Sequence, residues 1–371
     1  ENNRLYKMND IKNNRIVTVA AAFIIVALSF IVLKELQAIL LPFFVAIIIS
    51  FLFEPFYEWM KRKRVPSFAA IIVVVIAIII LSNIISVFVY TSINSFRDEI
   101  PKYTQKSVLL VDNFVNYLVS IGVSSQSLKE NLDVTKIFTG EKFATMLTDL
   151  ISGVAGIFTN FVLILIYVIF LLSEFSNIKR RVIKAFSKER SRKITETLTD
   201  IFRDVRKYIV GKTLINFAHA LSITIIFWIF GLDFALIWGV LTFLLVYIPN
   251  IGAFVATLLP FLTALIQYDN ILTPIILLII MMVMGSVFGS LIEPKVLGDR
   301  LNLSPILLLF SLIFWGYIWG IVGMILSVPV MSMIKIVLSK FESTCPLAIL
   351  MSHDVSRKNN PEQKEIEFDK K

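Results

Sequence analysis

Residues 234–268 read FALIWGVLTFLLVYIPNIGAFVATLLPFLTALIQY, a run of 35 residues without a charge. A transmembrane helix needs roughly 20 apolar residues, so this run is too long for one ordinary span and too short for two spans with a turn. Its middle reads YIPNIG, where Pro249, Asn250 and Gly252 end helices and form turns. Each arm of about 14 residues reaches only about 21 Å. The pattern predicts a re-entrant helical hairpin, which enters and leaves on the same side of a membrane.

A second charge-free run, at 301–334, has the same construction over 34 residues. Three glycines lie near its middle: Gly316, Gly320 and Gly323. One full-length apolar run precedes each hairpin, 213–232 before the first and 270–292 before the second, and the two runs cross in opposite directions. The first hairpin therefore opens from outside and the second from the cytoplasm, so that 213–338 forms an inverted repeat. Interrupted segments at matching places in two halves are typical of secondary transporters; the alternative is kinked pairs of ordinary spans whose glycines serve close packing.

The composition of the whole chain is that of a polytopic membrane protein. Of its 371 residues, 57% are hydrophobic and only 17% are charged, whereas soluble domains have about 25% charged residues. One cysteine and two histidines leave little material for a disulfide framework or a metal centre. No P-loop, nucleophile elbow or similar catalytic motif occurs. We therefore expect no enzyme, no cofactor, no metal site and no nucleic-acid partner; the expected partners are the lipid bilayer and a small-molecule substrate.

The distribution of Lys and Arg predicts the orientation of the chain, because basic loops stay in the cytoplasm. Four further apolar runs precede the repeat, at 16–33, 36–53, 68–90 and 150–173. The loop 174–212 has twelve Lys/Arg against five Asp/Glu, whereas 93–149 has six against seven. We expect an inner (plasma) membrane protein with both termini in the cytoplasm and 93–149 outside.

The predicted fold class is an all-α polytopic membrane protein, with four N-terminal spans followed by an inverted repeat of a full span and a re-entrant helical hairpin. The predicted divisions are 1–92 for the N-terminal tail and spans one to three, 93–149 for an extracytoplasmic helical cap, 150–173 for span four, 174–212 for a basic cytoplasmic amphipathic region, 213–338 for the transport domain and 339–371 for a cytoplasmic tail. The amphipathic region suits anionic headgroups or packing beneath the bundle. A hinge that moves with span five is equally compatible with it.

Few polar residues lie within the spans, and each is a candidate functional residue. Asn216 and His219 are three residues apart on one face of span five, where a histidine suits a proton relay or an interhelical hydrogen bond. Glu293 ends the inward span, where it either couples to a cation or pairs with Lys295 or Arg300.

The hairpin tips are the candidate substrate-binding segments. Asn250, among carbonyl groups that Pro249 frees, is the best candidate for contact with a neutral polyol, and forming the turn is its alternative role. The other candidate tip residues are Gly252, Gly316, Gly320 and Gly323. No span contains an unpaired Asp or Glu at mid-depth, which favours a small organic substrate over pure ion exchange.

Several motifs resemble those of the autoinducer-2 exporter family. They are VRKYIVGK at 205–212, IPNIG at 248–252, IEPKVLG at 292–298, LSP at 303–305 and WGYIWGIVGM at 315–324 with the Val-Pro pair that follows. The resemblance covers roughly 34–340 and implies a bacterial inner-membrane permease that forms a homo-oligomer, a pentamer in this family. Members are associated with export of the furanone signal autoinducer-2, and some with sodium–proton exchange. Members often carry asparagine just before the Glu-Pro pair, where this chain has Gly289 and Ser290.

The sequence thus predicts a permease or exporter of a small organic solute such as the autoinducer-2 furanone. The expected mechanism is elevator-like alternating access, in which the hairpins and their flanking spans move against spans one to four. The alternatives are a sodium/proton antiporter and a non-transporting oligomeric scaffold or pore.

Overall fold

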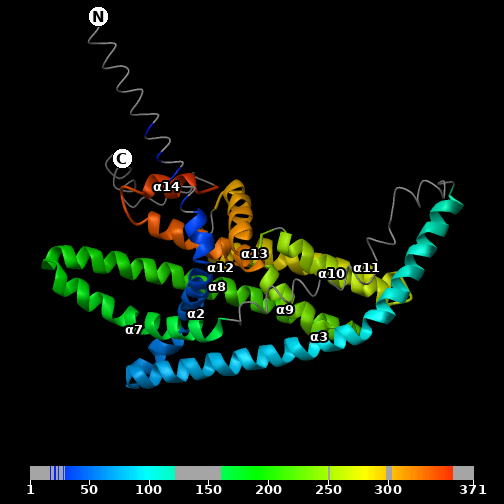
Figure 1. Ribbon diagram of the computed structural model, residues 1–371, viewed down its shortest axis with the longest axis horizontal. Coiled ribbons are helices and arrows are strands. Elements are labelled where there is room, and N and C mark those ends of the chain that lie inside the picture. Colours follow the sequence, from blue (N-terminus) through cyan, green and yellow to red (C-terminus); the bar gives the residue numbers. More distant parts are fainter. Residues whose placement is uncertain are drawn as a thin grey trace, which may run out of the picture.

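The computed structural model, shown in Figure 1, is built from helices. It describes residues 30–121, 160–249, 251–297 and 303–353, together with residues 17, 21, 24 and 28. Most of the predicted first span, the part of the predicted cap from residue 122 on, the start of predicted span four up to residue 159, Asn250, residues 298–302 and the chain end beyond 353 lie outside the described residues.

The helices of the described part follow one another in a simple order. They are α2 (Gln37–Arg62), α3 (Ser67–Ser120), α7 (Phe161–Ala185), α8 (Lys188–Phe230), α9 (Ala235–Leu245), α10 (Ile251–Gln267), α11 (Leu272–Ser286), the π-helix η1 (Val287–Ile292), α12 (Glu293–Leu297), α13 (Pro305–Leu338) and α14 (Cys345–Leu350). Five stretches are long and apolar enough to cross a membrane: Gln37–Arg62, Ser67–Val87, Lys188–Phe230, Leu272–Leu297 and Pro305–Leu338. The prediction of an all-α polytopic membrane protein is therefore confirmed.

The N-terminal helices α2, α3 and α7 pack around one buried cluster. Ala46, Val74 and Val168 are fully buried at its centre, and their small side chains let the three helices approach closely. Helix α3 continues unbroken for 54 residues, so the predicted third span and the start of the predicted cap are one helix. In Figure 1 this long cyan helix extends well beyond its contacts with α2 and α7.

Helix α8 is also longer than the span that the sequence predicts. Its 43 residues join the predicted basic amphipathic region to the predicted span 213–232 without a break. Gly231 ends the helix in the left-handed conformation, with φ 70°, which glycine adopts without a steric penalty. The amphipathic region is therefore a rigid continuation of the span.

The predicted first hairpin is a pair of short helices. Helices α9 and α10 have 11 and 17 residues and are separated at the predicted Pro249 break. Gln267, the last residue of α10, contacts the segment that leads into α9. Its Oε1 accepts a hydrogen bond from the Asp233 N–H at 2.7 Å, and its Nε2 donates to the Gly231 carbonyl at 2.7 Å. Since the chain returns to where it started, a hairpin is formed.

The predicted second hairpin lies within α13, whose helical path is interrupted at Gly320 (φ 63°, ψ −145°). Ser311 Oγ donates a hydrogen bond to the Ser327 carbonyl at 3.3 Å. Sixteen residues of straight helix would separate these positions by about 24 Å, so the two arms must fold back on each other.

The C-terminal segment closes the base of this second hairpin. Leu303 and Ser352 form an antiparallel bridge, and the Ser304 N–H donates to the Met351 carbonyl at 2.9 Å. Up to residue 353, the predicted cytoplasmic tail is therefore an ordered part of the structure.

A glycine allows close approach at each hairpin tip. A Cβ on Gly252 would overlap the Leu245 carbonyl, and a Cβ on Gly323 would overlap the Trp315 carbonyl. Gly320 has open space around its missing Cβ, and it is required for its positive φ instead.

We expect Gly252→Ala and Gly323→Ala each to lower the free energy of unfolding by about 1–3 kcal/mol, because an added methyl group forces the arms apart. Gly285→Ala is the matched control: its Cβ would meet nothing within 4 Å, so it should be neutral or stabilising by up to about 1 kcal/mol. Thermal unfolding in detergent, followed by tryptophan fluorescence, measures the difference. Equal stability of all three variants would show that the tips are loosely packed.

Candidate functional site

A polar stripe runs along one face of α8. Lys212, Asn216 and His219 are spaced by four and three residues, which places them on the same side of the helix. All three are buried, with relative exposures of 5%, 0% and 6%. Buried polar side chains are costly within a membrane, so a stripe of three points to a function or to firm partners.

Lys212 provides the partner of Glu293. Its Nζ lies 2.6 Å from Glu293 Oε1, and the side chains are only 7% and 18% exposed. The sequence predicted Lys295 as a partner of Glu293, but the lysine that reaches Glu293 is Lys212. Lys295 is exposed on α12. The predicted pairing with Lys295 is therefore wrong, and Arg300 lies outside the described residues. Residues two apart on a helix do not face each other, so Lys295 points away from the side that Glu293 presents to α8.

The π-helix η1 leads directly into Glu293. Such wide helical turns are rare and occur mostly near functional sites. Pro294 lacks an N–H, which removes one helical hydrogen bond at the same place. Phe288 of η1 stacks on the His219 ring, with centroids 4.9 Å apart and an interplanar angle of 17°. The stripe is therefore contacted by η1 at His219 and by Glu293, the residue that follows η1, at Lys212.

Several buried polar atoms around the stripe have no hydrogen-bond partner among the described residues. Two belong to the stripe itself: Asn216 Oδ1 and His219 Nδ1. Two more are the hydroxyls of Tyr208 and Ser332, which adjoin each other without a hydrogen bond of good geometry. An unsatisfied buried group costs about 1–3 kcal/mol, so Asn216 and His219, which have two such atoms on one face of α8, are candidates for contact with a ligand.

The first hairpin contacts the stripe at its break. The hydroxyls of Thr213 and Tyr247 are 2.8 Å apart, and Asn216 Nδ2 donates a long hydrogen bond of 3.5 Å to the Phe243 carbonyl. The predicted tip residues Pro249 and Gly252 follow Tyr247 within five residues, and Asn250 lies outside the described residues. The stripe and the first tip are thus brought together.

The second hairpin contacts α8, and Ser332 of its second arm adjoins Tyr208. Its tip, with Gly316, Gly320 and Gly323, packs elsewhere: Trp315 and Trp319 lie against Phe44 of α2, with centroids 6.2 and 5.4 Å away. Trp319 Nε1 also donates to the Leu33 carbonyl at 3.2 Å. These glycines therefore shape the tip and do not line the stripe.

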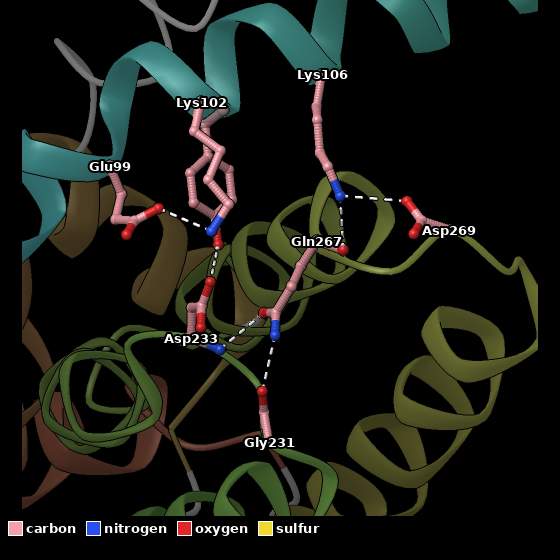
Figure 2. A network of polar contacts seen from close by, with 8 residues as sticks. Glu99, Lys102, Lys106, Gly231, Asp233, Gln267 and Asp269 are labelled. Atoms are coloured by element: carbon pink, nitrogen blue, oxygen red, sulfur yellow. Dashed lines mark hydrogen bonds and ion pairs between the residues drawn. The ribbon is translucent and has the colours of Figure 1, made fainter.

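A second polar network ties the first hairpin to α3, as Figure 2 shows. Tyr103 donates to Asp233 Oδ2 at 2.8 Å, and Lys106 Nζ lies 3.1 Å from the Gln267 carbonyl and 3.2 Å from Asp269 Oδ1. Burial, followed by the bond to Asp233, raises the pKa of the Tyr103 phenol, so it stays a neutral donor. A cavity of about 370 Å³ beside the network is lined in part by Glu99, Lys102, Trp228 and Asp233.

Sequence reasoning missed Lys212, Tyr208 and Ser332. The signal for Lys212 was present, because it lies one turn before Asn216 on the same face as His219. Serine and tyrosine within apolar helices give no comparable signal, since their usual partner is a backbone carbonyl or another helix.

Known proteins resemble this chain over most of its length. The model of the AI-2E family transporter matches residues 21–343. A putative transport protein of Borreliella burgdorferi is 30% identical over 317 residues, covering 85% of each chain. The putative transport protein YhhT of Escherichia coli (strain K12) is 29% identical over 317 residues, covering 84% of this chain and 86% of the relative. The AI-2 transport protein TqsA of the same strain is 28% identical over 319 residues, covering 85% and 89%.

The names of these relatives describe transport proteins, in agreement with the several helices long and apolar enough to cross a membrane and with the motifs around both hairpins. The chain is a multi-pass membrane protein and belongs to the AI-2E transporter family.

Proposed function

We propose that the chain is a secondary transporter that moves a small neutral, hydroxyl-bearing organic solute across the inner membrane. The single observation that carries this proposal is the polar stripe of α8. Asn216 Oδ1 is a hydrogen-bond acceptor without a donor, and His219 Nδ1 also lacks a partner among the described residues. A solute that donates hydroxyl hydrogens would satisfy both.

The solute class fits a named relative. One relative is called an AI-2 transport protein, and the autoinducer-2 furanone is a small molecule with several hydroxyls. The solute would bind between the stripe and the first hairpin break, where Thr213 and Tyr247 supply two further hydroxyl groups. Lys212 and Glu293 neutralise each other, so the site as a whole suits an uncharged ligand.

The proposed mechanism is elevator-like alternating access. The cluster around α8–α11 and the cluster of α2, α3 and α7 have separate centres. Phe51 of α2 also packs with α8 and Leu41 of α2 with α13, so in this proposal movement of the hairpins against the N-terminal helices rearranges these contacts. In this proposal the two hairpins are re-entrant from opposite sides, both termini are cytoplasmic, and the chain works as a homo-oligomer, the pentamer that the family resemblance implies.

Two alternatives are separated from this proposal by the same assay. A sodium/proton antiporter would exchange ions without moving an organic solute, and a scaffold or pore would show no substrate-specific, saturable flux. The buried Lys212–Glu293 pair is the observation that favours an ion-dependent process.

Liposomes that contain the purified protein and are loaded with labelled autoinducer-2 furanone should release it faster than protein-free liposomes with the same load. The release should saturate with furanone concentration and be inhibited by unlabelled furanone. A parallel arm with imposed sodium or proton gradients and an internal pH dye tests antiport. Gradient-driven ion exchange without furanone release would replace the proposal with the antiporter, and no flux in either arm would favour the scaffold.

Asn216→Leu should separate folding from transport. Asn216 Oδ1 has no partner among the described residues, and Asn216 Nδ2 makes only a long hydrogen bond of 3.5 Å to the Phe243 carbonyl. An apolar side chain of similar shape should therefore leave the fold intact, with the unfolding midpoint within roughly 4 °C of the parent. Loss of one hydrogen bond to the solute should reduce furanone release by about ten- to a hundredfold.

Thr242→Val is the matched control, because Thr242 is buried but bonds only the Trp238 carbonyl of its own helix, at 2.7 Å. It should transport like the parent. Normal furanone release by Asn216→Leu would remove the stripe from the solute pathway.

A further inference from the structure

The turn that joins α2 to α3 contains an arginine in a backbone conformation that favours glycine. Arg64 has φ 65°. Its N–H donates to the Lys61 carbonyl at 3.0 Å, and the Val65 N–H donates to the Met60 carbonyl at 3.2 Å. These two hydrogen bonds form a Schellman motif, whose left-handed position is usually glycine because a Cβ is strained there. An arginine at this position therefore needs a reason that lies in its side chain.

The electrostatics of the chain itself do not supply that reason. Residues 61–64 are all basic, and within this run Lys61 pairs with Glu58 at 3.5 Å. Arg62, Lys63 and Arg64 are exposed and have no carboxylate partner in the described part of the chain. Positive charge is favourable at the C-terminus of a helix and in a cytoplasmic loop, but neither effect requires a charge at the strained position. The three cations therefore suit an anionic partner outside the chain.

The turn lies where the surface of a bilayer is expected. Gln37–Arg62 and Ser67–Val87 are both long and apolar enough to cross a membrane, and only residues 63–66 join them. Two consecutive spans with so short a connection must turn at the membrane surface, because the apolar stretch of each fills the hydrocarbon core. The unpaired cations are thus at the level of the lipid headgroups.

Exposed aromatic side chains accompany the cations. Trp59 and Phe56 are 51% and 38% exposed, and their rings stack with centroids 5.9 Å apart and an interplanar angle of 15°. Tryptophan is typical of the headgroup level, where its apolar ring and its polar N–H are both accommodated. Lys63 Nζ lies 4.4 Å from the centroid of the Trp59 ring. This cation–π contact holds the ammonium group beside the aromatic surface before any ligand binds.

We propose that the α2–α3 turn is a binding site for the headgroup of an anionic phospholipid. Arg64 and Lys63 bind the phosphate, the guanidinium through two parallel N–H donors and the ammonium as a point charge. Trp59 and Phe56 lie against the glycerol and the upper part of an acyl chain. The bound lipid offsets the backbone strain at Arg64. Basic clusters next to a span recognise anionic lipids by the same chemistry.

Thermal unfolding of the full-length protein in mixed micelles tests the site. The micelles contain either phosphatidylglycerol or phosphatidylcholine at the same mole fraction, and unfolding is followed by the loss of helical circular dichroism. The parent should unfold at a midpoint roughly 2–4 °C higher in phosphatidylglycerol. In phosphatidylcholine, Arg64→Gly should match or exceed the parent, because glycine adopts the left-handed conformation without strain. The same variant should lose at least about half of the phosphatidylglycerol increment, because the phosphate loses its guanidinium.

Arg192→Gln is the matched control. Arg192 is exposed on α8 and pairs with Glu196 at 3.3 Å, so the change removes the same charge from a place that already has a carboxylate partner. It should keep the whole phosphatidylglycerol increment. Lys63→Gln is the second test variant and should lose part of the increment, as Arg64→Gly does.

A full increment in Arg64→Gly, or an equal loss in Arg192→Gln, would overturn the proposal and leave the basic run as a topology signal. A lower midpoint of Arg64→Gly in phosphatidylcholine would also overturn it, because Arg64 would then serve the fold itself. An equal increment with soluble glycerol phosphate would assign the turn to a free anion in place of a lipid. Because no solute flux is measured, the result is independent of the proposed transport function.

Discussion

A helix that ends inside a bilayer leaves N–H and carbonyl groups that lipid cannot satisfy, and in the proposed arrangement of two re-entrant hairpins this constraint governs the second half of the chain. The two breaks, after Leu245 and at Gly320, are tolerable only where protein surrounds them. Both tips meet the requirement by close packing of their own arms, since Gly252 and Gly323 bring one arm against a carbonyl of the other. Residues near both tips, including Ile248 and Ile321, also contribute to one hydrophobic cluster with α8 and α11.

The same constraint explains where the polar groups lie. The α8 stripe faces the π-helix and the first hairpin break, which are the two places where regular helical hydrogen bonding is interrupted. Irregular backbone and unpaired side-chain atoms therefore share one region, as expected when both serve a ligand. The second polar network, between α3 and the first hairpin, has a different role. It attaches both ends of the first hairpin to α3 through the Tyr103–Asp233 and Lys106–Asp269 contacts. If the hairpin moves against the N-terminal helices, this part of α3 must move with it, or these contacts must break.

Much of this arrangement can be predicted from sequence, because charge-free runs, proline and glycine act locally. The break at Pro249 and the interruption at Gly320 both lie where the pattern placed them. The helix lengths could not be predicted in this way. Helix α3 continues past its apolar stretch and α8 begins well before its own, because polar and apolar helical sequences join without a stop signal. The partner of Glu293 was also missed, because the ion pair joins residues 81 positions apart and depends on how η1 orients the carboxylate. Asn216 and His219 could be singled out as candidates because polar residues are conspicuous in an apolar span.

The central claim is that the two hairpins open on opposite sides of the membrane. Single cysteines at Asp233, Asp269 and Glu342, on a Cys345→Ser background, test it directly, because Asp233 and Asp269 bracket the first hairpin and Glu342 follows the second. A membrane-impermeant maleimide is applied to intact cells and to inverted vesicles. The account predicts that the cysteines at 233 and 269 react only from outside and the cysteine at 342 only from the cytoplasmic side. Labelling of 233 and 269 from different sides, or of all three from the same side, would contradict it.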